Sequence, residues 1–298
     1  MKISIVTPSF NQAAFIEETL LSVINQRYCN LEYLVIDGGS TDGSVEIIEK
    51  YRNYLSYYVS EPDDGQVDAI NKGMQIATGD ICAFINSDDI YLPGTFQLIT
   101  SYFKDNPQVD WVCGNTIFFG SDITPYYLKA RVPTRPVHGL LWEYHSPQPG
   151  MFWRRSNVNV DFDSSYNYCF DHDFYMKLLF TGKKCIHINY PVAGYRLHNT
   201  SKTFLHQCYF DQEFERIADF YLNRLTFFEK RKVNAVMKIR KVYQSFESND
   251  INVKFAVILI SMFKLFRIVF DYPFIVIKRS WWGTLRKAIR LLYTEVAR

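Results

Sequence analysis

Acidic, amide and hydroxyl side chains follow each of the first four strands that the sequence predicts. These polar runs are residues 7–11, 37–42, 61–68 and 86–89. A single run of this kind is typical of turns and helix caps, because Asp, Asn and Ser bond to nearby backbone groups. Four runs at one edge of a parallel sheet would place several carboxylates in one crevice, where their charges repel each other. A divalent cation or the basic groups of a ligand would relieve that repulsion, so the pattern predicts a ligand site.

The hydrophobic pattern predicts the elements that bring these runs together. Short apolar runs alternate with segments of helical periodicity over the first 120 residues, which indicates right-handed βαβ units. The predicted strands are residues 2–7, 31–37, 54–61, 81–86, 109–119 and 185–190, with a helix at 170–180 and an irregular stretch at 121–165. We expect an α/β fold with a mostly parallel central sheet flanked by helices, similar to a Rossmann fold. Ligands of such sheets bind at the carboxyl ends of the strands.

Two common nucleotide-binding motifs are absent from the sequence. The first predicted strand is followed by TPSFN, residues 7–11, and not by GxGxxG, so dinucleotide redox chemistry is not expected. No GxxxxGKS or GxxxxGKT segment occurs, which argues against P-loop hydrolysis. A diphosphate ligand would then need a metal in place of a glycine-rich cradle. Asp oxygens suit Mg²⁺ or Mn²⁺, and both ions keep open positions for phosphate oxygens.

Charge is distributed unevenly along the 298 residues, although the formal net charge is only +2. Residues 1–253 carry 24 basic against 29 acidic side chains, whereas nine basic side chains face two acidic ones from Lys254 onward. This balance argues against a nucleic-acid partner. The content of 48% apolar and 17% aromatic residues is typical of a globular protein with a large core. Six scattered cysteines and the lack of a cleavable signal predict reduced thiols and a cytoplasmic location.

The last 96 residues differ in character from the rest of the chain. Residues 203–298 are expected to form a helical C-terminal region, of which 250–298 is basic, aromatic and amphipathic. Its longest charge-free run, 255–263, has nine residues and is too short to span a bilayer. Segments of this kind typically lie in the interface of an anionic membrane. We therefore expect the protein to be cytoplasmic and peripheral on the inner face of the cell membrane. A helical pair that packs on the catalytic domain or on a second subunit is the alternative.

The order and spacing of four motifs resemble the family 2 glycosyltransferases, which have the GT-A fold. The motifs are IVTPSFNQAAFIEETLLSVINQ, YLVIDGGSTDGS, EPDDGQVDAINKGMQIATGD and INSDDIYLPG. The similarity covers about residues 2–200 and is greatest to bacterial members that build capsule, exopolysaccharide or lipopolysaccharide chains. It implies a GT-A catalytic domain at 1–202, with a nucleotide-binding half at about 1–120 and an acceptor-binding half at about 121–202.

The resemblance assigns residues to the nucleotide-sugar donor. The loop beside the base and ribose matches Thr7, Pro8, Ser9 and Asn11. Asp37 matches the acid that hydrogen-bonds the base, which is usually uracil, and Asp68 and Lys72 match residues near the nucleotide and diphosphate.

The resemblance also implies a metal site of Mn²⁺ or Mg²⁺. Asn86, Ser87 and Asp88 occupy the Asp-x-Asp motif of the family, and Asn86 departs from it, so contact with the ribose there would be through an amide. Asp88 would hold the metal on the diphosphate, and Asp89 would contact the donor sugar or support the site. His198 matches a histidine that reaches the metal or diphosphate, although a polar surface histidine is the alternative.

A catalytic base and an acceptor pocket are implied in the second half. Asp171 matches the base near the start of a helix; Phe170 replaces the Glu that often precedes it, and a capping role for Asp171 is the alternative. Gln148 and Trp153 match the acceptor side, with Trp153 in the core as the other interpretation.

Together these features predict an inverting, metal-dependent glycosyltransferase. The donor would be a nucleotide-sugar with UDP as the expected nucleotide, and the acceptor a hydroxyl of a polyprenyl-diphosphate-linked glycan. A binding-only partner subunit and a nucleotidyltransferase remain as alternatives, and a homo-oligomer stays open. A nucleotidyltransferase would release pyrophosphate and would normally carry a Gly-rich, basic loop after the first strand.

Overall fold

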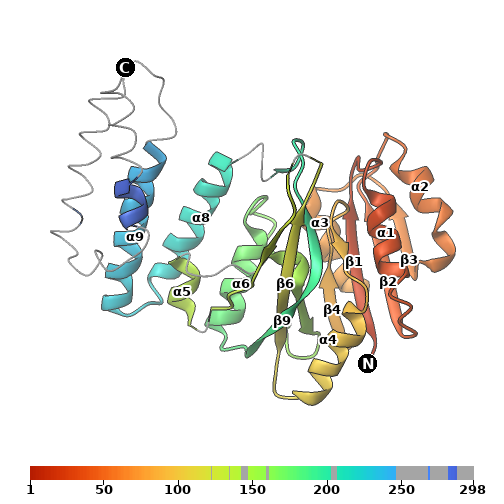
Figure 1. Cartoon of the computed structure of the whole chain (residues 1–298), viewed down its shortest axis with the longest axis horizontal. Coiled ribbons are helices and arrows are strands. Elements are labelled where there is room, and N and C mark those ends of the chain that lie inside the picture. The colour runs from red at the N-terminus through yellow and green to blue at the C-terminus, as the bar shows by residue number, and fades with distance from the viewer. Residues whose placement is uncertain are drawn as a thin grey trace. The chain divides into compact units, whose positions relative to one another are not determined.

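The computed structural model of the chain describes residues 1–121, 123–133, 135–141, 147–158, 161–202, 207–245, 268 and 281–286. Its contacts divide the chain into two compact units, Met1–Phe214 and Glu215–Arg298. The described part of the first unit is an α/β structure built on one sheet, and that of the second consists of helices (Figure 1).

The first part of unit 1 alternates strands and helices as the hydrophobic pattern predicts. Its elements are β1 (Ile3–Ser9), α1 (Ile16–Ile24), β2 (Leu31–Asp37), α2 (Ser44–Lys50), η1 (Arg52–Tyr54), β3 (Tyr57–Ser60), α3 (Gln66–Ile76) and β4 (Ile81–Phe84). β1 pairs in parallel with β2 and β4, and β2 pairs in parallel with β3. The four predicted strands are confirmed, and their carboxyl ends lie at one edge of the sheet.

The second part of unit 1 corrects the prediction of a mostly parallel sheet. Its elements are β5 (Ile90–Tyr91), α4 (Thr95–Asp105), β6 (Trp111–Phe119), β7 (Tyr126–Leu128), α5 (Pro136–Leu140), η2 (Gln148–Gly150), β8 (Met151–Arg154), α6 (Phe170–Phe180) and β9 (Cys185–Arg196). β8 lies between β4 and β6 and is antiparallel to both. The sheet order is β3-β2-β1-β4-β8-β6-β9-β5, with β7 antiparallel to β6. The sheet is therefore mixed, and β8 arises inside a stretch that was expected to be irregular.

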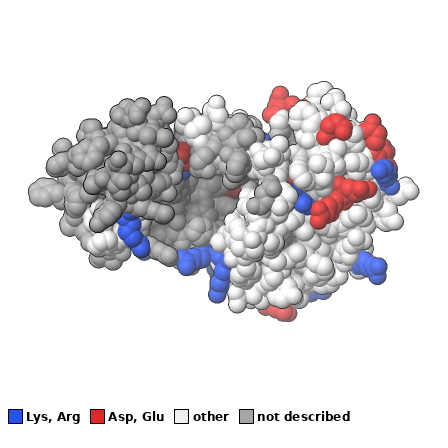
Figure 2. All heavy atoms as spheres, turned by 45° about the horizontal axis from the view of Figure 1, so that its top comes forward, with Lys and Arg blue, Asp and Glu red and all other residues white. Residues whose placement is uncertain are grey.

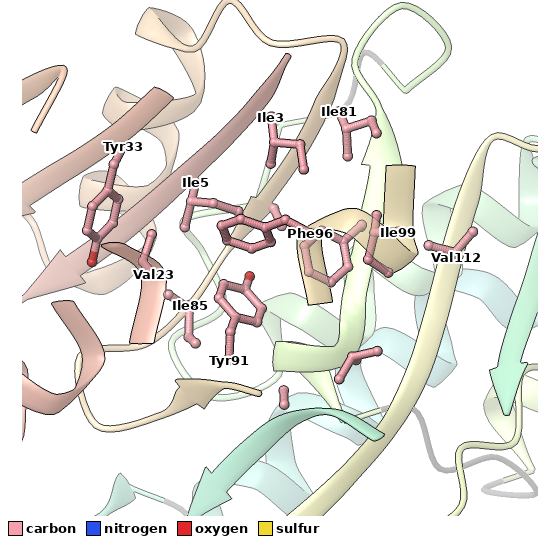
Figure 3. Packing of buried hydrophobic residues seen from close by; sticks show 14 of the residues in the cluster. Ile3, Ile5, Val23, Tyr33, Ile81, Ile85, Tyr91, Phe96, Ile99 and Val112 are labelled. Carbon is pink, nitrogen blue, oxygen red and sulfur yellow. The ribbon is translucent and has the colours of Figure 1, made fainter. Parts of the chain in front are cut away.

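The core is built on the two faces of β1. Ile3 and Ile5 belong to the cluster that includes α1 and α4 residues such as Val23, Phe96 and Ile99 (Figure 3). Side chains alternate along a strand, so Val6 points to the other face. There α3 approaches closely, because a Cβ on Gly73 would lie 2.4 Å from Cγ1 of Val6. Apolar residues on both faces explain why this strand has a continuous apolar sequence.

Glu32 anchors the opposite, amino-terminal edge of the sheet. Its carboxylate accepts hydrogen bonds from Lys2 Nζ, Ser4 Oγ and both the backbone N and Oγ of Thr78. Burial alone would raise the pKa of Glu32, but these donors outweigh it and lower the pKa to about 2.

We expect Glu32→Gln to lower the free energy of unfolding by about 2–3 kcal/mol at pH 7, because one charged acceptor with four donors is lost. The folded pKa lies below the unfolded value, so this contribution is complete above about pH 4.5 and disappears as the pH falls toward 2. Urea denaturation of both proteins at pH 7 and pH 3 measures the difference. A gap of the same size at both pH values would contradict the assignment.

The described helices of the C-terminal part are α8 (Gln207–Leu222), α9 (Phe227–Ser245) and a helical stretch at 281–286. They lie within the span for which the sequence predicts helix. In the described part of the chain, no helix is both long and apolar enough to cross a membrane. The predicted amphipathic segment 250–298 lies outside the described residues, apart from residue 268 and residues 281–286.

Among the residues that Figure 2 does not draw in grey, charged side chains are spread unevenly. Red Asp and Glu atoms gather on the right of that view, over elements of the first part of unit 1. This matches the acidic balance of residues 1–253 in the sequence.

Candidate active site

A cavity of about 930 Å³ opens at the carboxyl ends of the parallel strands. It is lined by the segments that follow β1, β2, β3, β4 and β9, together with η2 and the first turn of α6. Nine of the residues that the sequence singled out line it: Pro8, Ser9, Asn86, Ser87, Asp88, Asp89, Gln148, Asp171 and His198. Residues up to 190 positions apart in the sequence thus meet at the edge where a ligand was expected.

The loop after β4 joins the loop after β9 through Asp88. Oδ2 of Asp88 lies 3.0 Å from Nε2 of His198, and Nδ1 of His198 lies 2.7 Å from Oγ1 of Thr200. Nε of Arg196 donates to the backbone oxygen of Asp88 at 2.8 Å. The Asp88 carboxylate and the His198 ring are thereby held together in the cavity.

Asp89 is buried beneath this pair. Its Oδ1 accepts a hydrogen bond of 2.8 Å from the backbone N of Arg196, and Nδ2 of Asn86 lies 3.4 Å from its Oδ2. Burial, with the charge of Asp88 beside it, raises the pKa of Asp89 well above its ordinary value. Asp89 therefore fixes the loop and does not present a free carboxylate.

The Asp88 and His198 pair has the chemistry to bind a divalent cation. No cluster of three or more His, Cys, Asp or Glu side chains suited to a metal occurs in the described parts of the chain. Mg²⁺ and related ions are often held by one or two protein carboxylates, with substrate phosphates and water as the other ligands. Asp88 and His198 therefore fit a cation whose remaining ligands come from a bound diphosphate and water.

Asp37 and Asn11 shape the loop that follows β2 and do not line the cavity. The Asp37 carboxylate accepts hydrogen bonds from the backbone N of Gly39 at 3.1 Å and from N and Oγ of Ser40 at 2.8 and 2.6 Å. A fourth bond, of 2.7 Å, comes from Oγ of Ser60. Asn11, at a positive φ of 52°, accepts from the backbone N of Thr41 at 2.9 Å.

Thr7 lies wholly inside the core, 3.1 Å from the hydroxyl of Tyr33. The acid that lines the cavity near Gly38 is Asp63, whose Oδ2 would lie 2.9 Å from a Cβ on Gly38. Burial raises the pKa of Asp63. It belongs to the predicted polar run 61–68 but was not singled out there.

The other two predicted donor residues, Asp68 and Lys72, lie on α3 outside the cavity lining. Their ion pair is 3.1 Å long. The cavity instead receives Gln66 and Lys202, which the sequence did not single out. Nζ of Lys202 donates to Oε1 of Gln66 at 2.9 Å, and Nε2 of Gln66 donates to Oδ1 of Asn86 at 2.7 Å. Burial lowers the pKa of Lys202, although the negative charges of Glu213 and Asp88 act to raise it.

Asp171 lies in the first turn of α6, on the cavity wall. Burial raises the pKa of Asp171 to about 6, and the charge of Glu213 adds to this effect. The backbone N of His172 donates to its Oδ1 at 2.8 Å. The neighbouring acid Asp173, two residues further along α6, pairs with Lys177 at 2.9 Å.

Glu213 of α8 positions the chain that leads into α6. Its carboxylate accepts hydrogen bonds of 2.8 Å each from the backbone N of Asn167, Tyr168 and Cys169. The contact spans more than 40 residues of sequence. No local sequence pattern signals it.

The two predicted acceptor residues, Gln148 and Trp153, lie in different places in the structure. Gln148 lines the cavity, and its Nε2 donates to the backbone oxygen of Phe84 at 2.7 Å. Trp153 is buried on β8 against Phe162 and Phe174, beside a second cavity at the amino ends of β1 and β4. The structure thus favours the core role for Trp153 that the sequence left open.

Four buried polar atoms on the cavity wall have no hydrogen-bond partner in the described part of the protein: Ser9 Oγ, Gln12 Oε1, Gln148 Oε1 and Ser201 Oγ. Buried polar atoms are nearly always paired in folded proteins, and an unpaired one marks a place where a ligand or water binds. The cavity is therefore prepared for a polar ligand.

Residues 4–176 match the family model described as "Glycosyl transferase family 2". The chain belongs to glycosyl transferase family 2. An uncharacterized glycosyltransferase of Nostoc sp. is 30% identical over 127 residues, which are 42% of this chain and 39% of the relative. One from Rickettsia typhi is 25% identical over 239 residues, which are 75% of this chain and 72% of the relative.

Solved structures show that this member of family 2 has the expected GT-A type of fold. S. aureus TarS is similar with a TM-score of 0.62 and 21% identity, covering 84% of this chain and 46% of TarS. The mannosyltransferase PcManGT of Pyrobaculum calidifontis has a TM-score of 0.55 and 16% identity, covering 98% of this chain and 87% of that protein. The chain spans less than half the length of the Nostoc relative and of TarS.

Proposed function

We propose that the protein transfers a sugar from a nucleoside-diphosphate donor to a hydroxyl group, with inversion at the anomeric carbon. The observation that carries this proposal is that a carboxylate and imidazole pair, Asp88 and His198, shares one cavity with Asp171, a carboxyl group of raised pKa. The first arrangement suits a diphosphate leaving group and the second suits proton removal.

The diphosphate end of the donor would lie against the loop after β4. Asp88 and His198 would hold a Mn²⁺ or Mg²⁺ ion, which supplies charge neutralisation to the departing diphosphate when bound. Lys202 offers a second positive charge at the same wall. Support comes from structures in which TarS 1-349 is in complex with UDP-GlcNAc and PcManGT is in complex with GDP-Man and Mn²⁺. We propose a UDP-sugar as the donor.

Asp171 would act as the general base. It takes the proton of the acceptor hydroxyl while that oxygen forms a bond to the anomeric carbon and the bond from this carbon to the diphosphate breaks. The electron pair leaves with the diphosphate, so a single displacement inverts the configuration. The unpaired Oε1 of Gln148 can accept a hydrogen bond from a second acceptor hydroxyl.

We further propose that the acceptor is a polyprenyl-diphosphate-linked glycan and that the protein works at the cytoplasmic face of the membrane, in the synthesis of a surface polysaccharide. The support for this part is the basic, aromatic sequence of 250–298.

A thermal-shift screen tests donor and metal together. We expect one UDP-sugar, at about 100 times its Kd in Mn²⁺, to raise the Tm by about 5–10 °C. Excess EDTA should abolish the shift, because the diphosphate then lacks its counter-charge. NAD⁺ with Mn²⁺ is the control and should give no shift. Equal shifts with and without EDTA would contradict the metal site, and release of UDP in the presence of membranes would exclude a binding-only role.

A further inference from the structure

Three phenylalanine rings near the connection between α8 and α9 are exposed to solvent, one at the end of α8 and two at the start of α9. Phe220, Phe227 and Phe228 are 57%, 68% and 73% exposed, and Phe228 has the largest exposed fraction among the bulky apolar side chains described. We call residues 219–232 the aromatic tip. Phenyl rings exposed together on one short segment are unusual for a surface that faces only water.

The fold of the helical pair does not require these rings. Thr226 and Glu229 form a capping box, in which the backbone N and Oγ of Thr226 donate to Oε2 of Glu229 at 3.0 and 2.8 Å. This box fixes the start of α9. Tyr221, Leu225 and Val233 are buried nearby. Phe227 and Phe228 occupy the first two positions of α9 and are exposed.

Positive charges surround the rings. The aromatic tip carries four basic side chains, Arg224, Lys230, Arg231 and Lys232, against two acidic ones, Asp219 and Glu229. Glu229 is held by Thr226 in the capping box. The guanidinium of Arg224 lies 4.9 Å from the ring centre of Phe220, and that of Arg231 lies 6.0 Å from the ring centre of Phe227. The outward surface therefore combines aromatic rings with cations.

We propose that the aromatic tip inserts into the interface of an anionic lipid membrane. Aromatic rings are stable at the depth of the lipid headgroups, and nearby Lys and Arg side chains gain energy from anionic lipids. An acidic protein partner would satisfy the cations, but it offers no reason for three exposed rings at the facing ends of α8 and α9. A bilayer accommodates both features, because exposed rings can enter it without any matching pocket.

The proposal stands apart from the predicted membrane segment 250–298 and from the proposed sugar transfer. It rests on described residues of α8, α9 and their connection, and it requires no enzyme activity in its test. A protein that fails to transfer sugar would still bind vesicles through this surface.

Co-sedimentation of the full-length protein with vesicles tests the proposal. The vesicles contain either phosphatidylcholine alone or phosphatidylcholine with phosphatidylglycerol. We expect binding to the anionic vesicles that weakens at high salt. Phe227→Ser combined with Phe228→Ser, and separately Lys230→Glu combined with Arg231→Glu, should each lower the partition coefficient at least about tenfold.

Tyr54→Ser is the matched control, because Tyr54 is an aromatic residue of unit 1 with 63% exposure and no place in the aromatic tip. It should bind vesicles as the wild type does. Phe227 and Phe228 are exposed and Lys230 and Arg231 are half-buried. Circular dichroism should show unchanged helix content for each variant. Wild-type vesicle binding by both double variants would overturn the proposal. So would a loss of binding that appears only together with dissociation of a dimer, measured by light scattering, since that result assigns the surface to a second copy of the chain.

Discussion

Asp171→Asn is expected to lower the rate of sugar transfer at least about a hundredfold while leaving donor binding intact. The asparagine has nearly the same shape as the aspartate and can still accept the 2.8 Å hydrogen bond from the backbone N of His172. It cannot take a proton. Transfer is measured as release of the nucleoside diphosphate, and donor binding as the thermal shift in Mn²⁺.

The pH dependence follows from the raised pKa of Asp171. A base with a pKa of about 6 is deprotonated above that pH, so wild-type transfer should fall about tenfold per unit as the pH drops below 6. The same shift acts on stability. The folded pKa lies above the ordinary value of 3.8, so ionised Asp171 destabilises the protein above pH 6, by about 3 kcal/mol at most. Asp171→Asn should therefore unfold no more easily than the wild type at pH 7.5.

Asp173→Asn is the control on the same helix. Its carboxylate pairs with Lys177, so we expect lower stability and transfer within about threefold of wild type. If Asp171→Asn retains near-wild-type transfer, Asp171 is not the base.

Asp88→Ala is expected to lower kcat/KM by at least about a hundredfold and to remove the effect of Mn²⁺ on donor binding. Asp88 contributes a carboxylate that lies 3.0 Å from His198 in the cavity, whereas Asp89 is buried and engaged by Arg196 and Asn86. Without Asp88, His198 alone of this pair would remain to bind the cation. Donor affinity is measured in Mn²⁺ and in EDTA, and the two values should coincide for the variant.

Asp64→Ala is the matched control for Asp88→Ala, because it also removes one carboxylate at the same edge of the sheet. Asp64 is exposed and does not line the cavity, so its loss should leave the response to Mn²⁺ unchanged. An Asp88→Ala protein that still binds the donor more tightly in Mn²⁺ than in EDTA would show that the cation is held elsewhere.

The sequence predicted the strands of the first half and the edge where the site lies, because both depend on local patterns. The mainly apolar strands β1, β2 and β4 alternate with helices of clear periodicity, and polar residues follow each of them. The motifs that contain Asp88, Asp171 and His198 predicted that these residues share one site. In the structure all three line one cavity.

What the sequence could not predict depends on distant contacts. β8 follows Pro147 and Pro149 in a proline-containing stretch that shows no regular pattern, yet it separates β4 from β6. Lys202 enters the cavity through Gln66, a partner 136 residues away. Asp37 looked like a free acid after a strand, whereas the folded loop surrounds it with donors from Gly39, Ser40 and Ser60.

The helix α8 links the two units in a way that matters for making fragments of the protein. It runs from Gln207 to Leu222 without interruption, and the boundary between the compact units falls inside it, after Phe214. Glu213, one residue before that boundary, holds the chain that leads to Asp171. A truncation at the boundary would leave Glu213 on a frayed helix end, so an isolated catalytic fragment should extend at least to Leu222.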